Sequence, residues 1–133
     1  MIRVLVKTDT RYPVNRKIIR RAVFDTLSKY KAGESNTEVS VAVVGIRKMD
    51  KLTSDFKKDA KVHEVLSFPF EDVDSASGSG FISVPDGVLR LGDIILCWPQ
   101  VLLAAARDGV MVDDEVYLLV SHSVEHLLGR HHE

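Results

Sequence analysis

Three histidines near the end of the sequence have a spacing that suits one metal ion. His122 and His126 are four residues apart in a segment with helical periodicity, so their side chains lie about 40° apart around the helix axis, one turn from each other. Gly129 then lets the chain turn back, which allows His132 to approach the same ion from another direction. A metal site with these three ligands is therefore predicted by the pattern H-x-x-x-H-x-x-G-x-x-H.

The expected metal is a single zinc ion. Three neutral nitrogen ligands with an open fourth position match a catalytic zinc site better than a closed structural site, which would normally add cysteines. Zinc lowers the pKa of a bound water to about 7, so a hydroxide nucleophile would exist at neutral pH. The alternative is a histidine-rich tail that binds metal only adventitiously, and the helical spacing and the glycine at the turn argue against it.

The residues beside these histidines limit the choice of a general base. Metzincin peptidases have a glutamate base directly after the first histidine, where this sequence has Ser123, and a serine cannot replace a carboxylate in proton transfer. Glu125 creates the inverted pattern H-x-x-E-H and lies about 60° from His122, so it could approach a metal-bound water. The competing interpretation is a glutamate in a surface salt bridge.

The histidines must be positioned by strands and helices. Apolar and β-branched segments predict strands, and apolar residues that recur every three or four positions predict helices. Predicted strands cover residues 2–7, 38–46, 63–70 and 89–98, and predicted helices cover residues 13–32, 48–58, 99–107 and 113–128. This order indicates an α+β fold, an α/β sandwich whose mixed sheet of about four strands carries a zincin-like metal site on the last helix.

Prolines and glycines mark the ends of these elements. Pro13 is expected in the first turn of the first helix, and Gly33 is expected to end it. Pro69 argues for an end or edge position of its strand. Gly92 marks a bulge or a close backbone approach in the last strand.

Two segments and one cysteine complete the expected structure. The nearly continuous apolar segment 38–46 is consistent with a central strand buried on both faces. The Asp-, Ser- and Gly-rich segment 71–88 predicts a long functional loop. Cys97, the only cysteine, is expected to be a buried apolar residue without a catalytic role.

Composition places the sequence among globular proteins. Its 133 residues are 45% hydrophobic and 28% charged, which suits one domain with its own core. No apolar run approaches the roughly 20 residues needed to span a bilayer, and no signal peptide is recognisable at the start, so a cytoplasmic protein without a membrane partner is expected.

Charge is distributed unevenly along the sequence. Residues 1–61 carry 15 Lys and Arg against 7 Asp and Glu, whereas residues 62–133 carry 3 against 12. A basic first half suggests a surface for a polyanion. The alternative is that these charges only solvate exposed helix faces.

The metal motif and two upstream segments resemble the YbeY family of metal-dependent endoribonucleases, which act in ribosomal RNA maturation. The family signature is H-G-x-L-H-L-x-G-Y-D-H, and its histidines and glycine coincide with those of residues 122–132. VLSFPF at residues 65–70 and LGDIIL at residues 91–96 look like the family segments D-V-L-S-F-P and L-G-D-I-V-I. The resemblance covers roughly residues 39–133, and this ordered combination is more specific than any single motif.

The resemblance implies roles for individual residues. It makes the three histidines the zinc ligands and places Ser67 and Phe68 along the active-site cleft. An arginine that the family uses in RNA cleavage corresponds to Lys57, which keeps a positive charge but lacks the bidentate guanidinium fork. Glu115 matches a family glutamate seven residues before the first histidine. Departures that make the sequence a divergent member are Ser123, Glu125, Arg130, His131 and His63-Glu64.

We therefore expect one domain, residues 1–133, that is a single-zinc endoribonuclease of ribosomal RNA processing and ribosome quality control. Ribosomal RNA would be its substrate, and ribosomal proteins are further candidate partners. The candidate catalytic residues are Lys57 and Glu125, and the candidate RNA-binding residues are Arg16, Arg20, Lys57 and Lys58. Two alternatives stay open: a zinc metallopeptidase with Glu125 as base, and a non-catalytic, metal-stabilised protein that binds RNA or the ribosome.

Overall fold

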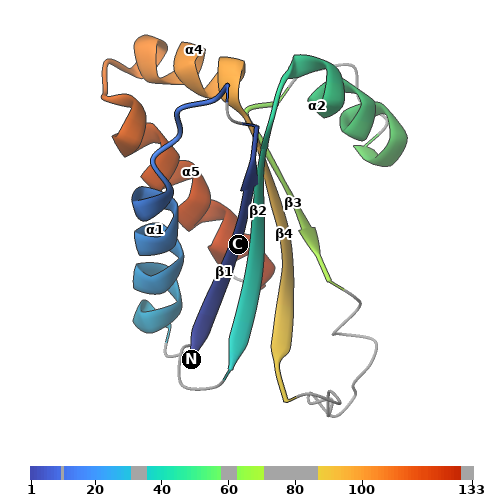
Figure 1. Cartoon of the computed structure of the whole chain (residues 1–133), viewed down its shortest axis with the longest axis vertical. Helices are drawn as coiled ribbons and strands as arrows, with labels where there is room; N and C mark the ends of the chain where they lie inside the picture. The colour runs from blue at the N-terminus through green and yellow to red at the C-terminus, as the bar shows by residue number, and fades with distance from the viewer. Residues whose placement is uncertain (10, 31–35, 58–62, 71–86, 130–133) are drawn as a thin grey trace.

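A computed structural model describes residues 1–9, 11–30, 36–57, 63–70 and 87–129 (Figure 1). In chain order its elements are β1 (Ile2–Thr8), α1 (Arg16–Lys29), β2 (Thr37–Val44), α2 (Ile46–Leu52), the π-helical turn η2 (Thr53–Lys57), β3 (Val65–Pro69), β4 (Leu89–Cys97), α4 (Trp98–Asp108) and α5 (Val112–Leu127). The predictions for Gly33, Lys58, residues 71–86 and residues 130–133, His131 and His132 among them, lie outside the described residues.

The four described strands form one mixed sheet in the order β1-β2-β4-β3. Strands β1, β2 and β4 are parallel, and β3 runs antiparallel to β4. The predicted mixed sheet of four strands is confirmed, and β3 has the edge position that Pro69 indicated. None of the described helices has the length and apolar composition needed to cross a membrane.

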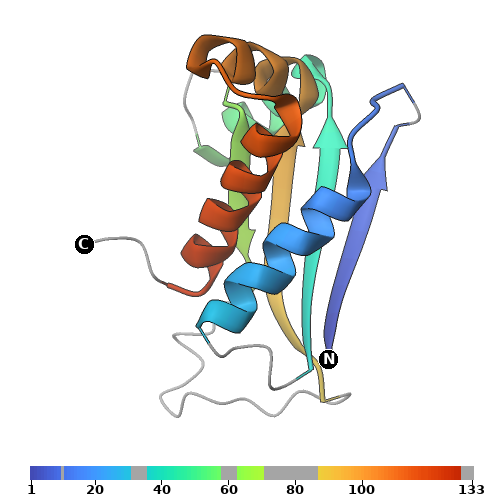
Figure 2. The same ribbon diagram turned by 90° about the vertical axis from the view of Figure 1, so that its left-hand side faces the viewer.

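Helices cover the two faces of the sheet unequally. Helices α1 and α5 lie side by side on one face, and α2 packs on the other face near the carboxyl end of β4 (Figures 1 and 2). The main core lies under α1 and α5 and includes Val41, Ile94 and Val120. A smaller cluster under α2 contains Met49, Leu66 and Cys97, so the prediction of a buried cysteine is confirmed.

Two expectations from the sequence need correction. Strand β2 is buried on one face only, because Val39, Val41 and Val43 are covered by the helices while the residues between them are half-buried. An apolar run does not reveal that α2 covers only part of the second face. Pro13 precedes helix α1 instead of lying in its first turn, since the helix is capped by Asn15, whose side chain accepts a hydrogen bond from the Lys17 amide at 3.1 Å.

Gly92 produces both irregularities that its position in β4 suggested. The pairing of β2 with β4 shifts by one residue, because Glu38 pairs with Arg90 and Val39 pairs with Gly92. A Cβ atom on Gly92 would lie 2.3 Å from the Phe68 carbonyl oxygen and 2.9 Å from Leu127 Cδ2. Only a residue without a side chain therefore lets β3 and the end of α5 approach β4 so closely.

Candidate metal centre

Helix α5 is held in place along its apolar side and near both ends. Its buried residues are Glu115, Val116, Val120, Ser123 and Val124. Near the start of the helix, Asn15 Nδ2 donates a hydrogen bond to Asp113 Oδ2 at 3.0 Å, and near the end Tyr30 Oη donates to Glu125 Oε2 at 2.9 Å. Helix α1 therefore runs in the same direction as α5 and fixes its position at both ends (Figure 2).

His122 and His126 are exposed on the side of α5 that is turned away from α1. Successive helix residues differ in direction by about 100°, so His126 points well away from Glu125, which contacts α1. The next residue, Leu127, packs over Gly92 beside Pro69 at the end of β3. The two imidazoles therefore share an open surface next to β3.

The structure brings together two of the three predicted zinc ligands. His122 and His126 lie one turn apart and are both open to solvent, which fits the donor set of a zinc site with nitrogen ligands. The described residues contain no group of three or more His, Cys, Asp or Glu side chains placed to hold a metal ion. The third predicted ligand, His132, lies outside them, so the complete site stays a prediction.

Glu125 is engaged with α1, about 60° from His122 and about 100° from His126 around the axis of α5. Besides accepting the hydrogen bond from Tyr30, its carboxylate lies 3.8 Å from Lys29 Nζ. Its side chain is 27% exposed. These contacts correspond to the salt-bridged glutamate that was the competing interpretation of this residue.

The two predicted cleft residues point to different faces of the sheet. Ser67 pairs with Ile94, whose side chain lies in the core under α5, so Ser67 faces the histidine helix. Phe68 pairs with Asp93, and its ring packs with the α2 cluster that contains Met49. The ring of Phe68 is therefore not on the α5 face, although its carbonyl oxygen lies at the close approach to Gly92.

The candidate RNA-binding residues lie away from the histidines. Arg16 and Arg20 occupy the first two turns of α1, and Arg20 lines a groove with Ile2 and Val4 of β1. Tyr117 of α5 donates a hydrogen bond to Asp25, where the groove borders α5. The backbone of Lys57 ends η2, beyond α2. The structure therefore does not bring the two arginines together with the histidines.

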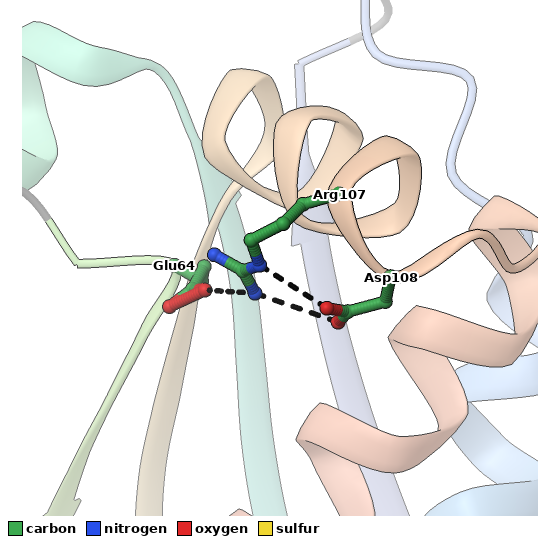
Figure 3. A network of polar contacts seen from close by, with 3 residues as sticks. All are labelled: Glu64, Arg107 and Asp108. Carbon is green, nitrogen blue, oxygen red and sulfur yellow. Dashed lines mark hydrogen bonds and ion pairs between the residues drawn. The ribbon is translucent and has the colours of Figure 1, made fainter.

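Sequence reasoning missed a polar network that joins β3, α4 and α5. Figure 3 shows Arg107 between two carboxylates, with Nη2 3.4 Å from Glu64 Oε2 and Nε 3.1 Å from Asp108 Oδ1. Glu115, only 3% exposed, is close enough to Asp108 to be influenced by its carboxylate. Because Glu64 lies 43 residues before Arg107, no local pattern indicated that the two side chains meet.

Glu115 has an altered acidity because of where it lies. Burial raises the pKa of the Glu115 carboxyl, and the charge of Asp108 raises that pKa further, while Arg107 opposes the shift. Glu115 lies seven residues before His122, so the two side chains are about 20° apart around the helix and about 10 Å apart along it. The network therefore links the start of β3 to the same side of α5 that carries the histidines.

Comparisons with known proteins agree on one family. The family model described as "Endoribonuclease YbeY" matches residues 6–133. An Endoribonuclease YbeY of Renibacterium salmoninarum is 34% identical over 116 residues, which cover 86% of this chain and 68% of the relative. One from Dehalococcoides mccartyi is 29% identical over 136 residues, which cover 99% of this chain and 84% of the relative.

A solved structure supports the fold. The solution structure of TM1509 from Thermotoga maritima matches with a TM-score of 0.58 at 21% sequence identity, covering 100% of this chain and 75% of that one. At this identity the similarity describes the fold alone. With the family model matched over nearly the whole length, the chain belongs to the YbeY family.

Proposed function

We propose that this protein is a single-zinc endoribonuclease that acts in ribosomal RNA maturation and ribosome quality control in the cytoplasm. The observation that carries the proposal is the pair of exposed imidazoles of His122 and His126, one turn apart on α5 and next to β3. The relatives named as endoribonucleases supply the reaction class. Ribosomal RNA is the proposed substrate, and ribosomal proteins are proposed as further partners.

The proposed zinc ligands are His122, His126 and His132. A bound zinc ion supplies a water of lowered pKa and a positive charge for a phosphate oxygen. Ser67 faces α5 from β3, and its hydroxyl is the proposed donor of a hydrogen bond to a phosphate oxygen.

Lys57 is the proposed contact for the phosphate next to the cut, with Lys58 as a further contact. An ammonium neutralises one phosphate oxygen as a point charge, whereas a guanidinium would hold two oxygens at once. We therefore expect weaker positioning of the phosphate than an arginine would provide. A Lys57→Arg variant should increase the cleavage rate.

Glu125 takes no part in the proposed RNA cleavage. To accept a proton at the metal it would have to leave both Tyr30 and Lys29, on the side of α5 that contacts α1. In the metallopeptidase alternative Glu125 is the base, so that alternative requires this rearrangement. Glu125→Gln therefore separates the two functions: RNA cleavage should persist in this variant, and a peptidase activity would be lost.

The decisive experiment compares wild type with His122→Ala and His126→Ala on purified ribosomal RNA. We expect cleavage by wild type alone, one zinc ion per chain by native mass spectrometry, and loss of both in either variant. Chelation should stop cleavage and added zinc should restore it. Because His122 is exposed, the free energy of unfolding of metal-free His122→Ala should lie within about 0.5 kcal/mol of that of the metal-free wild type.

Three outcomes would contradict this proposal in different ways. Cleavage that persists in His126→Ala or after chelation would remove the metal from the reaction. Casein turnover that disappears in Glu125→Gln would favour the peptidase. Zinc that raises thermal stability and RNA affinity without any cleavage would favour a non-catalytic RNA-binding protein.

A further inference from the structure

A groove runs along the outer side of α1, beside the edge strand β1. Its volume is about 480 Å³, within the range of about 300–1,000 Å³ that proteins use for small ligands. The residues that line it are Ile2, Val4, Lys17, Arg20, Arg21, Phe24 and Asp25. The groove therefore combines an apolar floor from β1 with a wall that is mostly cationic.

Among the described residues that line the groove, three cations face one carboxylate, Asp25. Lys17, Arg20 and Arg21 are spaced three and four residues apart, so they repel one another on one side of the helix. Lys17 also lies in the first turn of α1, where the helix dipole is already positive and no acidic residue is present. In the part of the chain that the structure describes, none of the three forms an ion pair.

The one carboxylate of the groove, Asp25, is already engaged. It accepts a hydrogen bond from Tyr117 Oη at 2.6 Å, on the side of α1 that faces α5. The hydrogen bond leaves the charge of Asp25 in place, and the three cations of the lining exceed it, so the groove keeps a net positive charge that can attract an anion. A polyanion suits this arrangement better than a single small anion, because the charges extend along the helix.

Phe24 adds a second feature that electrostatics alone does not explain. Its side chain is 57% exposed, one turn after Arg20 and in the same groove. An exposed aromatic ring among cations is the combination that binds single-stranded nucleic acid, since bases stack on the ring while phosphates meet the cations. Neither an acidic protein surface nor inorganic phosphate requires such a ring.

The groove lies at the opposite edge of the sheet from β3. The strand order is β1-β2-β4-β3, so about 15 Å of sheet separates the two edge strands. A ligand in the groove therefore cannot touch the histidine side of α5. It can only contribute to binding at a distance from the chemistry.

We propose that this groove binds a single-stranded segment of RNA, with Phe24 stacking on a base and Arg20 and Arg21 contacting phosphates. The identification of this RNA as part of the substrate rests on the proposed endoribonuclease function. The segment bound here lies beyond the cleaved bond, so the protein engages one RNA at two separate places. Its affinity should therefore be higher for RNA long enough to reach both sites.

The test is fluorescence anisotropy of a labelled single-stranded RNA, measured at several salt concentrations. Arg20→Gln/Arg21→Gln should reduce the slope of log affinity against log salt by about 1.4, or about 0.7 for each lost phosphate contact. Phe24→Ala should weaken binding about five- to 150-fold without changing this slope, and Phe24→Trp should restore it. The charge-matched control is Arg47→Gln/Lys48→Gln, on α2, which should bind as wild type.

Binding by Phe24→Ala equal to wild type, or an equal loss of slope in the α2 control, would refute the inference. So would Phe24-dependent cosedimentation with anionic phosphatidylglycerol vesicles while RNA affinity stays unchanged, because the groove would then bind a membrane surface. Repeating the measurement in a His126→Ala background separates the inference from the proposed function. If RNA binding depends on Phe24 but wild type cleaves no RNA, only the proposed endoribonuclease function is overturned. If wild type cleaves RNA with zinc but binding does not depend on Phe24, only the proposed RNA groove is overturned.

Discussion

Gly92 provides the sharpest test of how the candidate site is held together. In a Gly92→Ala variant the new Cβ would lie 2.3 Å from the Phe68 carbonyl oxygen and 3.0 Å from Pro69 Cα. Both atoms belong to the backbone of β3, so the clash cannot be relieved by rotating a side chain. Strand β3 would have to move away from β4 and from the end of α5.

Two costs add up in this variant. Forced overpacking typically destabilises a protein by about 1–3 kcal/mol. The φ angle of +149° at Gly92 is unfavourable for alanine and adds about 1–3 kcal/mol. A total of about 2–6 kcal/mol corresponds to a drop in Tm of about 8–24 °C, at about 4 °C per kcal/mol for a domain of this size.

Gly109→Ala is the matched control for this prediction. Gly109 also has a positive φ, +69°, but a Cβ there would meet no atom within 4 Å. The control should therefore lose only about 1–2 kcal/mol of unfolding free energy, from the unfavourable backbone conformation of alanine. Thermal and urea denaturation can compare this loss directly with that of Gly92→Ala. If Gly92→Ala lowers Tm no more than Gly109→Ala, the close approach of β3, β4 and α5 is not as described.

Three further predictions concern the polar and buried groups. Because the pKa of Glu115 is raised above 4.5, the stability it contributes is fully present below pH 4.5 and is lost as the pH rises through its folded-state pKa. The Tm of wild type relative to Glu115→Gln should therefore fall across that range in thermal scans, and a pH-independent difference would contradict the burial of this carboxyl. Burial raises the pKa of the Cys97 thiol, so thiol reagents should label it only as fast as the protein unfolds, and rapid labelling of the native protein would argue against its packing. Tyr30→Phe removes the hydrogen bond to Glu125 and should cost about 0.5–1.5 kcal/mol of unfolding free energy in urea titrations without slowing RNA cleavage, whereas a matching loss of cleavage would connect Glu125 to catalysis.

Most helices and strands could be predicted because the residues that start, end or interrupt them are close together in the sequence. The edge position of β3 follows from Pro69, which cannot donate a backbone hydrogen bond, and the end of α4 follows from Gly109, which adopts a left-handed conformation. The start of α1 was misplaced because Pro13 and Asn15 are both ordinary signals of a helix start. Only the structure distinguishes between them.

The candidate site also has features that follow from neighbouring residues and features that depend on contacts between distant parts of the sequence. The i, i+4 spacing predicted that His122 and His126 share one exposed side of a helix, and the structure agrees. The engagement of Glu125 depends on Tyr30, 95 residues earlier in the sequence, and no spacing rule reaches that far. The burial of Glu115 depends in the same way on contacts with other elements. From the sequence, a carboxylate in the first turn of a helix is expected to be exposed, whereas Glu115 is buried.

The position of β4 has a consequence for how the protein is made. Strand β4 follows β2 and β3 in the sequence but lies between them in the sheet. Until a ribosome has delivered residues 89–97, β2 has an open edge beside Val39, Val41 and Val43, all of which are buried in the finished protein. Open strand edges with apolar side chains promote association between chains. The unfinished polypeptide is therefore more prone to aggregate before β4 is made than after it has paired with β2. Synthesis of the last third closes the sheet and delivers the histidine helix in the same step.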